Sequence, residues 1–147
     1  MKNSKIFWIV ILIFLLGILI FMLTAGTDEE RVCFSQICLD VKVADSQNER
    51  AKGLMFVEKM DENEGMLFVF DYSDKHYFWM KNTLIPLDII WIDEDFTIVH
   101  IENAVPCVEK NCPSYFPEKK AKYVLEVNSG WAERNGIKIG EKINLEK

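Results

Sequence analysis

The run of residues 78–83 holds the residue types best suited to contacting a ligand. Two aromatic residues and a methionine are followed by Lys81, Asn82 and Thr83, which offer a cation, an amide and a hydroxyl at the end of a predicted strand. Lys81 can hold an anionic group, Asn82 can orient it, and Trp79 can stack on a sugar or another planar ring. The run therefore predicts the mouth of a binding pocket.

Arg50, in a predicted helix, offers a second cation for the same pocket. The ordinary alternative places Trp79 in the core and residues 82–83 in a turn. It also pairs Lys81 with Asp88 in a simple ion pair. The sequence leaves both interpretations open.

Asp88 and Glu126 are carboxylates set among apolar neighbours in two predicted strands. Together in one cleft, they could do general acid and base work if burial raised one of the two pKa values. The alternative is structural: Asp88 accepts backbone N–H bonds around Thr83, and Glu126 faces solvent by strand alternation. Their spacing does not show whether they meet.

Four methionines and two histidines raise the idea of a soft-metal site, because thioether and imidazole ligands suit copper. These residues form no tight Met-x-Met or His-x-His cluster, and methionine often fills gaps in cores. We therefore expect neither a metal nor a cofactor. The six residues are Met55, Met60, Met66, Met80, His76 and His100.

The cysteines form two pairs with the same spacing, Cys33 with Cys38 and Cys107 with Cys112. A hairpin through residues 34–37 would place the first pair on facing strands, so two local disulfides are the leading prediction. Crossed disulfides and a four-cysteine zinc site remain open alternatives. Oxidised cysteines leave no thiol nucleophile, and no Gly-x-Ser-x-Gly elbow occurs.

Residues 6–23 form an uncharged apolar run that is long enough to cross a membrane as a helix. Lys2 and Lys5 precede the run and three acidic residues follow it, which favours a cytoplasmic N-terminus. We expect a cytoplasmic tip at 1–5, an uncleaved signal anchor at 6–23, a linker at 24–31 and an extracytoplasmic domain at 32–147. A cleaved signal peptide fits less well, because its apolar region is normally shorter.

The predicted outer part is acidic. Without Lys2 and Lys5, 15 basic side chains stand against 23 acidic ones, a net charge of −8. Such a domain does not attract nucleic acid or anionic headgroups, so attachment to the cytoplasmic membrane would depend on the helix alone. The remaining partners to expect are a small-molecule ligand or another envelope protein.

The elements that must position these residues are mostly strands. Apolar alternation predicts strands over 38–43, 65–70, 76–80, 88–92, 96–101, 122–127 and 142–145. We expect 65–70 to pair with 76–80, and the acidic turn 93–95 to close a hairpin. Ser46 with Glu49 predicts a capped helix that ends at Gly53, and Ser129 predicts the cap of a second short helix. The pattern favours an α+β fold, a mostly antiparallel sheet that curls into a partial barrel.

Several of these segments, taken together, also match the sequence pattern of a known family. They are Gly53-Leu54-Met55, Gly65-Met66-Leu67-Phe68, Phe78-Trp79-Met80-Lys81-Asn82-Thr83, Pro86-Leu87-Asp88 and Val124-Leu125-Glu126-Val127. Over roughly 38–146 the chain resembles the family called domain of unknown function 192. The resemblance implies a compact β-rich fold of bacteria and archaea, often behind a signal or anchor. It implies no established reaction or ligand, and the paired cysteines are additions to the family's common pattern.

We therefore expect a membrane-tethered domain that binds a small polar or anionic ligand, or the end of a chain. The site would be framed by Arg50, Trp79, Lys81, Asn82, Thr83, Asp88 and Glu126. One alternative is a hydrolase-type envelope enzyme using the two carboxylates. Another is a protein-interaction module in which a sheet edge or the 107–112 loop meets an envelope protein.

Overall fold

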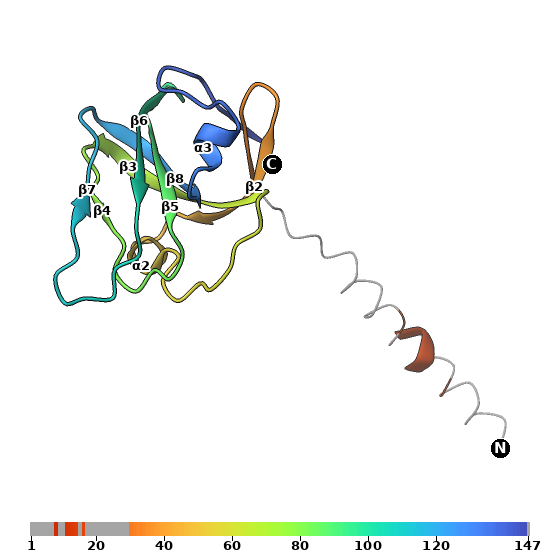
Figure 1. Cartoon of the computed structure of the whole chain (residues 1–147). Helices are drawn as coiled ribbons and strands as arrows, with labels where there is room; N and C mark the ends of the chain where they lie inside the picture. The colour runs from red at the N-terminus through yellow and green to blue at the C-terminus, as the bar shows by residue number, and fades with distance from the viewer. Residues whose placement is uncertain (1–7, 9–10, 15, 17–29, 147) are drawn as a thin grey trace.

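A computed structural model describes residues 8, 11–14, 16 and 30–146 of the chain (Figure 1). The predicted tip lies outside these residues, as do most of the predicted anchor and linker. Within the described part, no helix has both the length and the apolar character needed to cross a membrane. The anchor therefore stays a prediction. The first strand begins at Glu30, two residues before the predicted start of the outer domain.

The described part beyond residue 30 is built from short strands and two very short helices. In chain order these are β1 (Glu30–Cys33), β2 (Cys38–Ala44), α2 (Gln47–Lys52), β3 (Glu64–Asp74), β4 (Phe78–Trp79), β5 (Leu87–Ile92), β6 (Ile98–Ala104), β7 (Ser114–Tyr115), β8 (Ala121–Asn128), α3 (Trp131–Arg134) and β9 (Asn144–Glu146).

Seven of the strands form one sheet in the order β6-β5-β8-β3-β2-β1-β9. The predicted hairpins β1–β2 and β5–β6 are both present and antiparallel. However, β8 lies between β3 and β5, and β2 runs parallel to β3. The sheet is therefore rich in antiparallel pairs but is not a simple sequence of hairpins.

One predicted strand pair is wrong. The segment 65–70 does not pair with 76–80; instead β4 pairs with β7 in a separate two-stranded sheet, with Phe78 opposite Tyr115. Residues 75–77 connect β3 to β4 without regular secondary structure. Both edges of β3 are already paired, with β2 and β8, so β4 has no free edge of β3 to join. In the same connection, the His76 ring stacks on Phe70 with ring centroids 3.6 Å apart.

The large sheet is open in the order of its strands, and it ends at β6 and β9. Near the start of β6, the Ile98 N–H donates to the Glu141 carbonyl, and Thr97 forms an isolated bridge with Lys142. The predicted antiparallel-rich sheet with short helices is thus confirmed, and the structure shows this sheet to be open in its strand order. The curl into a partial barrel stays a prediction.

Strand alternation divides the core between the two faces of the sheet. Leu67, Ile90 and Leu125 belong to a cluster on one face, where Trp131 of α3 packs. Phe68 and Val124 belong to the cluster on the other face, which is joined by Leu54 just after α2. Figure 1 shows α2 and α3 on opposite sides of β8.

The two helices begin in different ways. At α2, the Ser46 hydroxyl accepts the Glu49 N–H while the Glu49 carboxylate accepts the Ser46 N–H, which is the predicted capping box. At α3 the predicted Ser129 cap is wrong, because Gly130 occupies the N-cap and no side chain within the cap supplies a bond. The carboxylate of Asp88 accepts the first N–H groups there instead.

Candidate functional site

Five of the seven predicted site residues line one narrow cleft between α2, β4 and β8. They are Arg50, Trp79, Lys81, Thr83 and Glu126. The mouth of the cleft is open to solvent, since Trp79 is 49% exposed, and the floor is closed by the buried side chains of Phe68 and Thr83. The cleft has a volume of about 30 Å³, which is room for one or two water molecules.

Glu126 is the unusual member of this cleft. Its side chain is only 4% exposed and its Oε2 has no hydrogen-bond partner among the described residues. Its cross-strand neighbours on the same face are Met66 and Ile89, both apolar. Burial in these surroundings raises the pKa of the Glu126 carboxyl to about 8. Near pH 7 this side chain is therefore mostly a neutral acid, which can donate a hydrogen bond.

Two cations stand near this acid without pairing with it. Arg50 donates from Nη1 to the carbonyls of Asp45 and Val69, and its guanidinium lies 5.2 Å from the ring centroid of Phe70. Lys81 places its Nζ 5.1 Å from the centroid of the Trp79 ring. No ion pair joins either cation to Glu126 in the part of the chain described. Their positive charge is therefore available to a ligand.

Asn82 contributes through its backbone. It adopts a left-handed conformation with φ 57°, and its carbonyl accepts the N–H of Phe56, which is itself left-handed with φ 65°. Left-handed backbone is costly for a bulky residue such as Phe56 and persists only where neighbouring contacts enforce it. The two segments that border the cleft, 53–56 and 81–83, are thus tied together, and Met55 forms a bridge with Thr83.

Asp88 lies elsewhere. It faces Val127 across the β5–β8 pair, whereas Glu126 faces Ile89, so the two carboxylates point to opposite faces of the sheet. Asp88 is not paired with Lys81; it accepts hydrogen bonds at 2.9 Å from Asn103 Nδ2 and from the N–H groups of Gly130 and Ala132. Asp88 and Glu126 therefore do not share a cleft.

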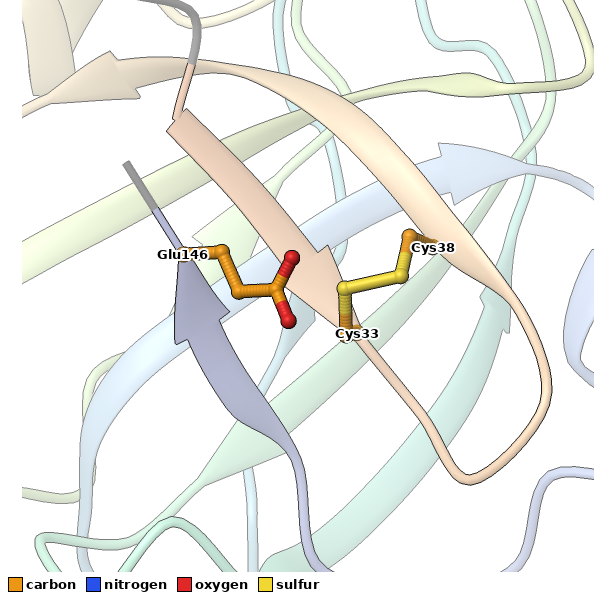
Figure 2. Close-up of side chains that lie close together, drawn as sticks. All are labelled: Cys33, Cys38 and Glu146. Carbon is orange, nitrogen blue, oxygen red and sulfur yellow. A yellow bond between two sulfur atoms is a disulfide. The ribbon is translucent and has the colours of Figure 1, made fainter.

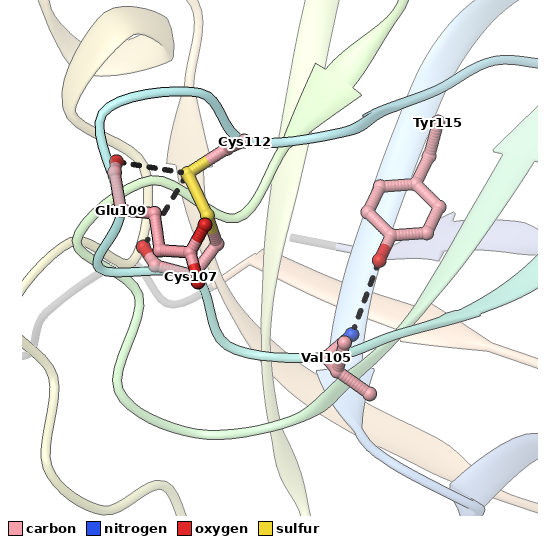
Figure 3. The surroundings of a disulfide bond; sticks show 5 residues. All are labelled: Val105, Cys107, Glu109, Cys112 and Tyr115. Atoms are coloured by element: carbon pink, nitrogen blue, oxygen red, sulfur yellow. Dashed lines mark hydrogen bonds between the residues drawn. A yellow bond between two sulfur atoms is a disulfide. The ribbon is translucent and has the colours of Figure 1, made fainter.

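The Cys107–Cys112 disulfide borders the strand end that carries Lys81. The Cys107 carbonyl accepts the Asn82 N–H at 3.0 Å, and the Cys107 N–H donates to Met80 at 3.2 Å. Figure 3 shows the bridge closing its loop, with Tyr115 accepting the N–H of Val105 alongside. The disulfide thus holds the segment against which residues 80–82 are fixed.

The other disulfide, Cys33–Cys38, joins facing residues of the β1–β2 hairpin. Glu146 of β9 lies beside it, and the three side chains form a group of possible metal ligands within the described residues (Figure 2). Both sulfurs are committed to the disulfide, and a zinc or copper site of this type needs thiolates. The group therefore does not fit a metal.

Sequence reasoning missed the glycine at the cleft. Gly53 has φ 47°, and a Cβ added there would lie 3.2 Å from Cζ of Phe68, so a larger residue would strain the backbone and press on the floor of the cleft. The available signal was the position of Gly53, directly after a predicted helix and within the Gly-Leu-Met segment. Such a glycine predicts a helix end, and only the fold shows that it also lines a cleft.

The family domain of unknown function 192, described as Uncharacterized ACR, matches residues 30–145. This chain belongs to that family. Two relatives come from archaea. The UPF0127 protein PH1112 of Pyrococcus horikoshii is 28% identical to this chain over 109 residues, and the UPF0127 protein PYRAB11210 of Pyrococcus abyssi is 27% identical over 108 residues. These matches cover 71% and 70% of this chain and 85% and 83% of the relatives.

Two crystal structures of similar proteins share the fold of this family member. A protein of unknown function from Novosphingobium aromaticivorans is 36% identical with a TM-score of 0.71, covering 79% of this chain and 83% of that one. A protein from Sinorhizobium meliloti, for which a role as a transcription regulator has been suggested, is 34% identical with a TM-score of 0.69. This match covers 79% of this chain and 91% of that one.

Proposed function

We propose that this member of the family is a membrane-anchored extracytoplasmic domain whose cleft binds a small polar or anionic ligand, or the end of a chain. The observation that carries the proposal is the buried, unpartnered carboxyl of Glu126 at the floor of a cleft bordered by Arg50 and Lys81. An unsatisfied buried polar group costs about 1–3 kcal/mol. A ligand that accepts a hydrogen bond from Glu126 would remove that cost.

The charge around the cleft supports an anion over a cation. Arg50, Lys52 and Lys81 all border it, and Glu126, the one acidic side chain along it among the described residues, is mostly neutral near pH 7. The exposed face of Trp79 lies at the mouth, where it can stack on a planar or sugar-like part of a ligand. The predicted roles of Arg50, Trp79, Lys81, Thr83 and Glu126 therefore all belong to this proposal.

The proposed location rests on the apolar run 6–23, the lysines before it, and two disulfides of a kind that persists outside the cytoplasm. Protease added to intact spheroplasts should degrade the domain and spare a membrane-held N-terminal fragment. A domain that is protected until the membrane is permeabilised would contradict this. The suggested regulator role of the Sinorhizobium relative is not extended to this chain, whose predicted outer part carries a net charge of −8.

An envelope enzyme is the second candidate, and Glu126 is the observation that favours it. A carboxyl with pKa near 8 can act as a general acid. A two-carboxylate hydrolase would need a second acid at about 5–10 Å in the same cleft, and Asp88 lies on the other face of the sheet. The enzyme alternative therefore rests on Glu126 alone, and Asp88→Asn should leave any turnover intact.

An interaction module is the third candidate. Val105, Val108 and Phe116 are apolar residues exposed on or beside the 107–112 loop, with Val108 76% exposed. Crosslinking from position 108 to another envelope protein would favour this candidate, provided that Lys81→Ala leaves the crosslink unchanged.

The binding proposal is tested on the full chain in a mild detergent, with the methyl groups of its methionines labelled with ¹³C. Met55 lines the cleft, whereas Met60 lines a separate hollow beside Asp40 and Lys59, so a shift of Met55 alone reports on the cleft. Acetate, inorganic phosphate and glucose are titrated in turn. A saturable shift of Met55 without one of Met60 supports the proposal. No shift with any of the three, or equal shifts of both methyls, contradicts it.

A further inference from the structure

The donors that remain unused at the cleft define the ligand more narrowly. Arg50 uses Nη1 for two backbone carbonyls, so Nε and Nη2 stay without a hydrogen-bond partner among the described residues. These two N–H groups lie side by side on the guanidinium, in the geometry that a carboxylate accepts in bidentate fashion. Packing on Phe70, with Nη1 held by the backbone, fixes the plane of this fork.

The floor of the cleft adds two further donors. Thr83 is a buried residue that lines the cleft, and its hydroxyl makes no hydrogen bond within residues 30–146. The Glu126 acid supplies an O–H where the carboxyl is protonated. With the two N–H groups of the Arg50 fork, the cleft thus offers four donors. A carboxylate has about four lone-pair sites on its two oxygens.

Resting on the proposed function, we infer that the ligand of this cleft is a carboxylate, such as the acidic end of a chain, held between the Arg50 fork and the carboxylic acid of Glu126. The cleft is narrow, with a volume of about 30 Å³, and a flat two-oxygen group is smaller than a tetrahedral phosphate. Lys81 at the mouth balances the ligand's charge. The acid and the carboxylate then share one proton, an arrangement that paired carboxyls adopt in other proteins.

This inference makes binding depend on the protonation of Glu126. The charged groups that border it are Arg50 and Lys52 from α2 and Lys81 after β4, while Glu102 and Lys42 lie in the same row of the sheet, on β6 and β2. Below the pKa of Glu126 the acid donates to the ligand. Above it, two carboxylates face each other and repel, so no proton is left to share. Affinity should therefore fall about tenfold from about pH 7 to about pH 9.

The test uses the full chain in detergent and the methyl signal of Met55, with Met60 as its control. The probe is N-acetylglycine, which presents a chain-end carboxylate, against N-acetylglycinamide, which lacks the charge, and inorganic phosphate. We expect N-acetylglycine to bind most tightly of the three probes, and its affinity to fall about tenfold from about pH 7 to about pH 9. Glu126→Gln should bind it with no such fall, because the amide N–H still donates, and Glu126→Leu should lose tenfold or more in affinity at about pH 7.

Arg50→Lys tests the fork, since it keeps the charge but removes the paired N–H groups. It should weaken N-acetylglycine binding about tenfold, whereas Arg134→Lys on the far surface should leave it unchanged. Tighter binding of phosphate or of the amide, or carboxylate affinity that is equal at the two pH values in the unaltered chain, would overturn the inference and leave the proposed function standing. No shift of Met55 with any probe would overturn both.

Discussion

Asp88 and Glu126 occupy neighbouring strands of one sheet and are buried to the same extent, 4% exposed each, yet they lie in opposite chemical surroundings. Asp88 accepts hydrogen bonds from Asn103, Gly130 and Ala132, and so begins α3. Glu126, on the other face, has an oxygen with no partner. A buried carboxylate with all its partners supports the fold, whereas one without them points to a site where a ligand completes the bonding.

The largest effect should come from the pH dependence of stability that Glu126 introduces. Its pKa is about 8 in the folded chain against an ordinary value of 4.5, so between these pH values the folded state holds a proton that the unfolded state has released. Stability therefore falls as pH rises through this window, by about 1.4 kcal/mol per pH unit. Glu126→Gln should remove the fall and be roughly 4 kcal/mol more stable than the unaltered chain at about pH 8.

The measurement for that variant is urea unfolding of the full chain at about pH 5 and about pH 8. The two proteins should be similar in stability at the lower pH, because Glu126 is neutral in the folded state there. A parallel pH dependence in both proteins would place the titration elsewhere.

Asp88→Ala should destabilise the protein by about 3 kcal/mol, because it leaves several buried or partly buried N–H groups without an acceptor. Urea unfolding at neutral pH gives the value. The same variant should leave the Met55 shift on ligand addition unchanged, since Asp88 lies on the other face of the sheet. A loss of binding without loss of stability would reverse the roles given to the two carboxylates.

Replacing Cys107 and Cys112 together by serine should cost about 2 kcal/mol, the value expected for opening a loop of this length. It should also weaken ligand binding, because Cys107 fixes Asn82 beside the cleft. The matched control replaces Cys33 and Cys38 together by serine. The disulfide removed in this control closes a loop of the same length, away from the cleft. Equal effects of the two variants on binding would mean that the Cys107–Cys112 disulfide has no specific role in holding the cleft.

The smallest effect belongs to the cap of α2. Ser46→Ala removes the hydroxyl that accepts the Glu49 N–H and should cost about 1 kcal/mol in thermal or urea unfolding. Because α2 carries Arg50, affinity for N-acetylglycine should fall modestly as well. Unchanged stability would indicate that packing alone holds the helix.

Comparing the two helix starts also explains what the sequence could predict. The capping box of α2 is local, within residues 46–49, so it could be read directly from the sequence. The cap of α3 comes from Asp88, 42 residues before Gly130, and no local pattern announces it. For the same reason the hairpins β1–β2 and β5–β6 were predicted correctly, whereas the insertion of β8 and the pairing of β4 with β7 were not.

The site residues divide in the same way, into those that a local pattern identifies and those that depend on pairing between distant parts of the sequence. Lys81, Thr83 and Trp79 could be singled out because a strand end with these residues is unusual in its own right. Strand alternation alone could not place Glu126, because both faces of this sheet are covered by core clusters and neither is solvent-facing. The separation of Glu126 from Asp88 follows from the register of β5 and β8, which depends on the whole sheet.

The most direct test of the account is the pKa of Glu126 itself, measured in the full chain by following the ¹³C signals of the glutamate side-chain carboxyls against pH. The signal that disappears in Glu126→Gln identifies the residue. We expect the Glu126 carboxyl to titrate with a midpoint near 8, raised by burial. A midpoint near the ordinary value of 4.5 would mean that Glu126 is ionised at neutral pH, and it would contradict both the donor role of this residue and the carboxylate ligand built on it.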